Sequence, residues 1–256
     1  MHAFLDHPGP IPFAHRGGAG DHPENTMAAF AAAVAMGFRY LETDVHATAD
    51  GVLLAFHDDR LDRVTDGHGV VSELPWSTVR AARVAGTDPI VPLDELLETW
   101  PDVRLNLDPK HDAAVMPLIA ALRRHRAIDR VCVGSFSMRR VARIRRLLGP
   151  ALCTSLAPPE VLAVRFAAWR LPGAGGLATR GAGACLQVPV REGIVPVIDR
   201  ATVVTAHRLG LPVHVWTVDD PAEMERLLDR GVDGIMSDRP AVLRDVLERR
   251  GAWHGT

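Results

Sequence analysis

Short apolar runs rich in β-branched residues alternate with longer helical patterns along nearly the whole chain. The strand-like runs span residues 11–15, 40–46, 104–108, 131–135, 152–155, 184–188, 213–217 and 234–237. The helical patterns span residues 26–36, 93–98, 113–125, 138–148, 159–169, 200–209, 222–230 and 241–249. This repeated alternation is typical of an α/β protein whose parallel strands close into a (β/α)8 TIM barrel.

The doubly wound open sheet is the alternative α/β fold. It needs a glycine-rich loop directly between the first strand and the first helix. Gly17, Gly18 and Gly20 follow the first strand, but the helical pattern starts only after Asn25 and Thr26. The dinucleotide-binding pattern therefore fails, and the barrel is preferred. Because 256 residues is the length of one such barrel, we expect a single domain over residues 1–256.

Two segments fall outside the regular repeats. Residues 57–92 contain the turn signal Asp66-Gly67-His68-Gly69, and we interpret them as a short excursion on the top face of the barrel after its second repeat. Residues 171–184 are rich in glycine and alanine, which indicates a mobile loop, and we assign them no chemistry.

Charge and cysteine content exclude several classes of function. The formal net charge is −2, so we expect neither a nucleic-acid nor an anionic membrane partner; the arginine-rich run 139–146 is interpreted as a solvated helix face. No apolar run is long enough to span a membrane, and the N-terminus lacks a signal-peptide core. The three cysteines have no metal-ligand spacing, so we expect reduced, buried thiols in a cytoplasmic protein.

Polar side chains gather at the ends of the second and third predicted strands. Side chains at positions i and i+2 share a face, so Glu42 and Asp44 point the same way, as do Asp108 and Lys110. Barrel folds build active sites at this end of their strands. Three clustered carboxylates need a compensating charge, and their oxygen ligands favour one Mg²⁺ or Ca²⁺ ion over zinc. The alternative is a set of structural salt bridges to Arg16 and Lys110.

Two histidines accompany these carboxylates. His15 ends the first predicted strand, and His57 ends the apolar run 52–56. They form a candidate acid–base pair, because phosphodiester cleavage needs one group to take a proton from the nucleophile and another to protonate the leaving alkoxide. Arg16 and Lys110 would supply positive charge for the phosphoryl oxygens.

Two aromatic residues lie at the predicted barrel mouth. Phe136 follows the fourth strand and Trp216 lies at the end of the seventh. We interpret both as walls of a substrate pocket. Few other apolar anchors are evident near the mouth, which favours small soluble diesters as substrates.

The ordered motifs resemble those of the glycerophosphodiester phosphodiesterase family. The matching runs are His15-Arg16-Gly17, Pro23-Glu24-Asn25-Thr26, Glu42-Thr43-Asp44-Val45, Asp50-Gly51, His57-Asp58, Asn106-Leu107-Asp108-Pro109-Lys110, Ser135-Phe136, Val215-Trp216-Thr217-Val218 and residues 231–240. The resemblance implies a TIM barrel that uses a divalent cation to hydrolyse glycerophosphodiesters to an alcohol and glycerol 3-phosphate. It also implies that His15 and His57 are the acid–base pair, that Glu42, Asp44 and Asp108 hold the metal, and that Arg16 and Lys110 contact phosphate.

The chain departs from the family pattern at two positions. Asp108 stands where the family usually has glutamate, so this ligand arm is one methylene shorter. Asp219 stands where asparagine is usual, and we expect this loop change to have little effect on the chemistry.

Two other functions remain as alternatives. A barrel lyase or aldolase would use Lys110 as a Schiff-base nucleophile, although a lysine beside carboxylates should stay protonated. A non-catalytic phosphate-ester binding protein would use the same scaffold, but it would not need two histidines. Within the hydrolase hypothesis, the sequence leaves open whether water or a neighbouring substrate hydroxyl attacks the phosphorus.

Overall fold

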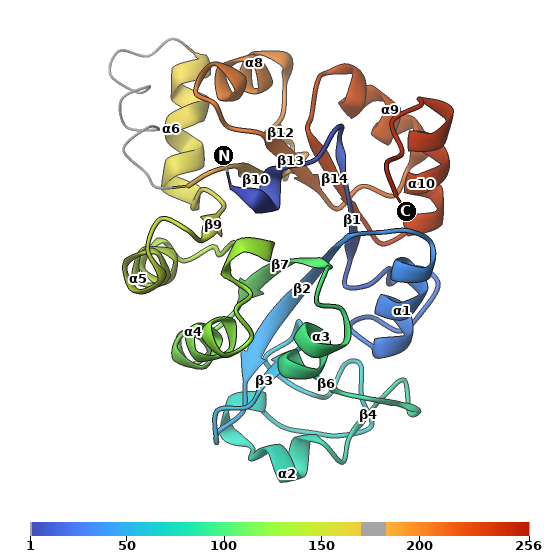
Figure 1. Ribbon diagram of the computed structural model, residues 1–256, viewed down its shortest axis with the longest axis vertical. Coiled ribbons are helices and arrows are strands. Elements are labelled where there is room, and N and C mark those ends of the chain that lie inside the picture. Colours follow the sequence, from blue (N-terminus) through green and yellow to red (C-terminus); the bar gives the residue numbers. More distant parts are fainter. Residues whose placement is uncertain (1, 170–182, 256) are drawn as a thin grey trace.

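The computed structural model describes residues 2–169 and 183–255 (Figure 1). Eight parallel strands follow one another around a curled sheet in the order β10-β13-β14-β1-β2-β7-β8-β9. These strands are β1 (Ile11–His15), β2 (Tyr40–Ala47), β7 (Arg104–Pro109), β8 (Val131–Val133), β9 (Cys153–Thr154), β10 (Leu186–Pro189), β13 (Val213–Trp216) and β14 (Gly234–Ser237). The predicted TIM-barrel fold is therefore confirmed.

The sheet closes at a short seam between β9 and β10. An isolated parallel bridge joins Ser155 to Cys185. Two backbone hydrogen bonds flank it, from the Leu156 N–H to the Cys185 carbonyl at 2.9 Å and from the Ala184 N–H to the Thr154 carbonyl at 2.8 Å. By contrast, β7 pairs over its whole length with Tyr40–Val45 of β2. The seam is the least extensively paired junction in the barrel wall.

Helices follow the strands much as the sequence indicates. They are α1 (Met27–Ala35), α3 (Leu93–Thr99), α4 (Val115–Arg124), α5 (Met138–Leu148), α6 (Pro158–Ala168), α8 (Arg200–Arg208), α9 (Pro221–Asp229) and α10 (Pro240–Arg249). Single-turn 3₁₀ segments are η1 (Ala3–Leu5), η2 (Val71–Glu73), η3 (Asp112–Ala114) and η4 (Ile128–Arg130). Aliphatic side chains between the sheet and these helices form the main core.

Capping residues set several of the helix starts. The Thr26 hydroxyl accepts a hydrogen bond from the Ala29 N–H at 3.2 Å and so caps α1. Asp220 caps α9 in the same way, with Pro221 as the first helical residue. The predicted strands 131–135 and 152–155 are shorter in the structure, because the chain already turns toward the N-termini of α5 and α6.

The excursion after β2 folds back on the sheet. In the structure it begins earlier than the predicted residue 57, with β3 (Leu53–Ala55), which pairs antiparallel with β2 and with β6 (Val91–Pro92). The excursion also contains α2 (Trp76–Val79) and an antiparallel pair, β4 (Arg83–Val84) and β5 (Asp88–Pro89). A small apolar cluster holds it together, formed by Leu54, Phe56, Leu61, Val71, Val79, Ala82, Val84 and Ile90. The excursion is thus a packed unit and not a loose loop.

The loop predicted over residues 171–184 lies outside the described part of the chain, except for its last two residues. A further antiparallel pair, β11 (Arg191–Glu192) and β12 (Val195–Pro196), lies between β10 and α8. In the residues that the structure covers, no helix has the length and apolar character needed to cross a membrane.

A second apolar cluster fills the barrel interior below the carboxyl ends of the strands. It comprises Phe4, Ile11, Phe13, Tyr40, Cys132, Cys153, Cys185 and Met236. The η1 turn packs against the amino-terminal end of the barrel, where the Tyr40 hydroxyl donates a hydrogen bond to the Phe4 carbonyl at 2.9 Å. Because this end is packed shut, the polar residues at the opposite end of the strands face the cavity described below.

Candidate active site

The turn after β1 places His15 and Arg16 at the barrel mouth. Arg16, Gly17 and Gly18 all have positive φ, at 50°, 81° and 100°. A Cβ on Gly17 would lie 2.9 Å from the Phe30 backbone nitrogen, so only glycine fits this tight turn against α1. The chain thus reverses directly after His15, and the Arg16 N–H points to Glu42 Oε2 at 3.3 Å.

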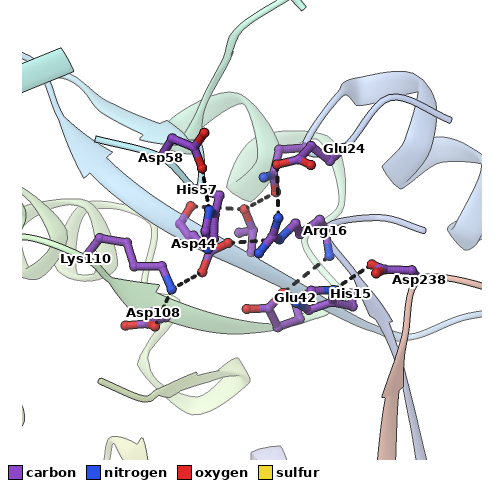
Figure 2. A network of polar contacts seen from close by, with 12 residues as sticks. His15, Arg16, Glu24, Glu42, Asp44, His57, Asp58, Asp108, Lys110 and Asp238 are labelled. Atoms are coloured by element: carbon purple, nitrogen blue, oxygen red, sulfur yellow. Dashed lines mark hydrogen bonds and ion pairs between the residues drawn. The ribbon is translucent and has the colours of Figure 1, made fainter. Parts of the chain in front are cut away.

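His15 lies between two carboxylates (Figure 2). Its Nδ1 is 2.6 Å from Asp238 Oδ1, and its Nε2 is 3.6 Å from Glu42 Oε2. Burial lowers the pKa of His15, but the negative charges of Glu42 and Asp238 outweigh burial and raise that pKa overall. The imidazole is therefore oriented and stabilised in its charged form.

Asp219 holds the carboxylate that orients His15. Its Oδ1 accepts hydrogen bonds from the Ser237 hydroxyl and from the Asp238 N–H, both at 2.8 Å. Asp219 thus fixes the backbone that presents Asp238 to His15. An asparagine oxygen would accept the same two hydrogen bonds, so the expectation that aspartate at this position has little effect on the chemistry stays a prediction.

Three carboxylates lie on the inward face of β2 and β7. Asp44 and Asp108 are register partners, and Glu42 is two residues before Asp44. The ammonium of Lys110 lies 2.6 Å from Asp44 Oδ1 and 2.8 Å from Asp108 Oδ2 (Figure 2). Arg16 Nε lies 3.3 Å from Asp44 Oδ2. The predicted face-sharing is confirmed, and both basic residues contact the carboxylates.

Two buried carboxylate oxygens are available to bind a cation. Asp44 Oδ2 and Asp108 Oδ1 are buried without a hydrogen-bond partner in good geometry. Burial raises the pKa of Glu42 to about 7 and also raises the pKa of Asp108. In the described part of the chain, no choice of one oxygen each from Glu42, Asp44 and Asp108 brings all three atoms within 4.8 Å of one another. Hard oxygen donors of this kind fit Mg²⁺ or Ca²⁺.

His57 enters the site from the excursion. Its Nδ1 lies 2.6 Å from Asp58 Oδ1. His46, at the end of β2, lies with Nε2 3.0 Å from the His57 carbonyl and supports the backbone there. Burial lowers the pKa of His46, which favours a neutral ring that donates this hydrogen bond. His15 and His57 line one cavity together with Glu42 and Lys110.

An ion-pair chain links Asp58, the carboxylate partner of His57, to Arg16, the residue after His15. Arg63, from the excursion, contacts Asp58 Oδ2 at 2.5 Å and Glu24 Oε1 at 2.7 Å. Glu24 in turn contacts the Arg16 guanidinium at 3.1 Å (Figure 2). The Arg63 hydrogen bond is the largest cause that lowers the pKa of Asp58 to about 2. This network joins the turn after β1 to the loop that carries His57.

Sequence reasoning about individual residues missed the supporting carboxylates and Arg63. Glu24 and Asp58 lie inside runs that were singled out as motifs, and Asp238 lies in the last of these runs. A signal for them was thus present, but nothing in the spacing assigned them partners. Arg63 is separated from Glu24 by 39 positions, and only the fold brings the two together.

The opposite side of the cavity is more apolar than the sequence suggested. The cavity measures about 740 Å³ and is lined on this side by Phe136, Trp216, Leu162 and Trp169, among others. The rings of Phe136 and Trp216 meet edge to face at 5.9 Å, and Phe136 is 66% exposed. Both predicted wall residues are therefore at the mouth. The expectation of few further anchors is wrong, because one face of α6 contributes apolar side chains.

The surroundings of Lys110 argue against Schiff-base chemistry. Burial lowers its pKa, but Asp108 and Asp44 outweigh burial and raise that pKa. A lysine nucleophile must be neutral to attack a carbonyl group. The ion-paired ammonium instead suits charge stabilisation.

Comparisons with known proteins agree with this geometry. The model of the glycerophosphoryl diester phosphodiesterase family matches residues 15–242. The Mycobacterium tuberculosis protein named probable glycerophosphodiester phosphodiesterase 2 is 43% identical over 98% of this chain and 96% of its own length. A Silicibacter pomeroyi crystal structure, whose name places it in the same family, superposes with a TM-score of 0.84 at 26% identity, covering 98% of this chain and 99% of that one.

A third comparison shows the same fold with a ligand. An Oleispira antarctica phosphodiesterase, solved in complex with the product sn-glycerol-3-phosphate, superposes with a TM-score of 0.79 at 23% identity, over 94% of this chain and 97% of that one. The family match covers most of the chain, and the strand-end residues fall within it. The chain therefore belongs to the glycerophosphoryl diester phosphodiesterase family.

Proposed function

We propose that this phosphodiesterase hydrolyses glycerophosphodiesters to an alcohol and glycerol 3-phosphate with His15 and His57 as its acid–base pair. The observation that carries the proposal is their shared cavity, in which each imidazole has a carboxylate on its Nδ1. An Nδ1–H donated to a carboxylate leaves Nε2 available to exchange a proton with the substrate. One imidazole then accepts the proton of the nucleophile, and the other protonates the leaving alkoxide.

The residues present fit a divalent cation. Glu42, Asp44 and Asp108 would hold it, and the proposal is supported by the buried Asp44 and Asp108 oxygens that accept no hydrogen bond. Members of this family generally depend on a divalent metal. When bound, an Mg²⁺ or Ca²⁺ ion would act as a Lewis acid that polarises phosphoryl oxygens.

Arg16 and Lys110 would bind the phosphate group. Both are already ion-paired with Asp44, so their positive charge is held at the cavity floor and does not need to be reorganised. Phe136 and Trp216 would flank the organic part of the substrate, since both line the cavity at its mouth.

The activity test measures glycerol 3-phosphate release from glycerophosphocholine with Mg²⁺ or Ca²⁺, and again with chelator. We expect chelation to abolish turnover, and the ion to restore it. Undiminished activity in chelator would remove the metal from the mechanism. Calorimetric titration of the ion into Asp108→Asn supplies a readout that does not depend on turnover, and we expect weaker binding than in the wild type.

The apolar side of the cavity favours a second class of substrate, one that carries an apolar chain. Pro158, Leu162 and Arg165 lie on one face of α6, and Trp169 directly follows the helix. The four residues line the cavity over about 16 Å. We propose that glycerophosphodiesters carrying one short acyl chain are better substrates than glycerophosphocholine, because the chain would bury apolar surface there. The test compares kcat/KM for glycerophosphocholine and its monomeric hexanoyl ester in wild type and Leu162→Ala. If the ratio of the kcat/KM values for the two substrates were the same in wild type and in Leu162→Ala, the proposal would be contradicted.

The proposed compartment is the cytoplasm. Its support is that all three cysteines are free and buried, as expected of a protein kept under reducing conditions. Partner molecules proposed for the chain are limited to the small-molecule substrate, because nothing in its charge points to nucleic acid.

A further inference from the structure

The chain has only three cysteines, and the fold gathers all of them. Cys132 and Cys153 are register partners on β8 and β9, and Cys185 immediately precedes β10. Their sulfur atoms all lie within 4.8 Å of one another. All three are fully buried, at 1% exposure or less. Residues more than 50 positions apart thus form one compact cluster of soft donors.

This cluster is separate from the active site. It belongs to the apolar group that fills the barrel interior, and Met236 is the one buried member of that group that also lines the catalytic cavity. None of the three cysteines lines that cavity. The carboxylates at the mouth offer hard oxygen donors, while thiols select soft cations such as Cu(I).

The cluster also spans the weakest junction of the barrel wall. Cys185 takes part in the single bridge that joins the two ends of the sheet, opposite Ser155. Cys153 lies two residues before Ser155, on the other side of that seam. A ligand bound to both sulfurs would therefore cross-link β9 to the start of β10, where few backbone hydrogen bonds do so.

We propose that Cys132, Cys153 and Cys185 form a binding site for one cuprous ion. Metal–sulfur bonds of about 2.3 Å in a planar three-coordinate site place the sulfurs about 4 Å apart. The observed cluster is within 4.8 Å, so a small contraction suffices. No fourth ligand from solvent is needed in such a geometry, which suits a buried site.

The donor set favours a soft ion. A thiolate, not a thiol, binds a metal ion, so each cysteine loses its proton to solvent as its Cu–S bond forms. Three soft sulfur donors in one buried cluster select Cu(I) over the hard ions that suit the carboxylates at the mouth.

The amino-terminal turn η1 packs against the same apolar cluster as the three cysteines. Phe4, in η1, is fully buried against the amino-terminal end of the barrel. The experiment therefore adds the ion in two ways, to the folded chain and during refolding, under anaerobic reducing conditions. Competition with the chromogenic chelator bicinchoninate measures affinity and stoichiometry, and X-ray absorption identifies the neighbouring atoms.

We expect one Cu(I) per chain, directly bound to sulfur atoms alone, and no displacement of the ion by excess Mg²⁺. Cys153→Ser should weaken binding about tenfold or more. The matched control is Thr154→Ser, the next residue on β9, which should bind like wild type. The ion should raise the thermal midpoint of wild type and the control, but not of Cys153→Ser.

Two results would overturn the site: no one-to-one complex by either route, or oxygen and nitrogen neighbours in the absorption spectrum. If Cys153→Ser does not fold, Cys132→Ser and Cys185→Ser replace it. The wild-type stoichiometry and absorption spectrum decide the question even if no cysteine variant folds. None of these measurements uses phosphodiesterase activity, so they are independent of the proposed mechanism.

Discussion

The two sides of the barrel mouth have different chemistry. The side formed by β1, β2, β7 and the excursion carries the histidines, the carboxylates and their basic partners. The side formed by the segments after β8, β9, β10 and β13 is mainly apolar, with Phe136, Leu162 and Trp169 exposed by 66%, 49% and 54%. The charged side is built on paired strands and cross-linked by ion pairs. The apolar side lies on a helix face and on loops.

This difference separates chemistry from substrate choice. Groups that move protons and bind phosphate must be held within a fraction of an ångström, and strand ends with a network of supporting carboxylates provide that precision. Groups that merely bury part of a substrate tolerate variation. Substitutions on the charged side should therefore change kcat, and substitutions on the apolar side should change KM.

The largest effect is expected from the histidines. His15→Ala or His57→Ala removes an acid–base group, and we expect kcat for glycerophosphocholine to fall about a hundredfold or more. The matched control is His125→Ala, which removes a histidine on the outer helices, paired with Asp94. The control should turn over normally. A near-normal rate for either site variant would exclude that residue from the mechanism.

A smaller loss is expected from the support of His15. Asp238→Asn should lower kcat about tenfold or more, with little change in KM, because the imidazole loses its orienting charge. Asp219→Asn keeps an oxygen that can accept from the Ser237 hydroxyl and the Asp238 N–H, so it should behave like wild type. Asp219→Ala should resemble Asp238→Asn. Equal rates for the two Asp219 variants would show that this residue does not position Asp238.

The ion-pair chain should matter less still. Arg63→Met breaks the link between Asp58 and Glu24, and we expect kcat to fall about tenfold or less through misplacement of His57. Arg60→Met serves as control, because Arg60 lies on the same excursion and, among the described residues, its only ion pair is with Asp62. A similar loss in both variants would indicate that the excursion is simply destabilised.

The smallest expected effect concerns stability against pH. The pKa of His15 is raised in the folded state, so its interaction with Asp238 stabilises the fold fully below the unfolded pKa of about 6.5 and is lost as pH rises through the folded pKa. Urea unfolding, measured with chelator present, should give a larger free energy of unfolding for wild type than for Asp238→Asn at about pH 5.5. This difference between the two proteins should shrink toward about pH 8.5. A difference that grows with pH would reverse the assignment.

The sequence by itself determined the periodic features of this protein. The alternation of apolar runs and helical patterns predicted the barrel, since strands and helices bury faces with different repeats. Parity along β2 and β7 placed Glu42, Asp44 and Asp108 on one inward face, because successive strand side chains point to opposite sides. Local capping by Thr26 and Asp220 was equally readable, since it depends on neighbours three residues away.

Only the tertiary structure decided which distant side chains meet. Asp238 reaches His15 across 223 positions, and Arg63 reaches Glu24 across 39, through loops whose paths follow no simple period. The three cysteines looked scattered, yet neighbouring strands of the closed sheet bring them into one cluster. The sequence likewise did not show that the apolar face of α6 lines the cavity. An apolar stripe on a helix normally indicates burial against the core, and only the structure shows what the stripe faces. Contacts made by barrel closure depend on all the strands together, and no local pattern encodes them.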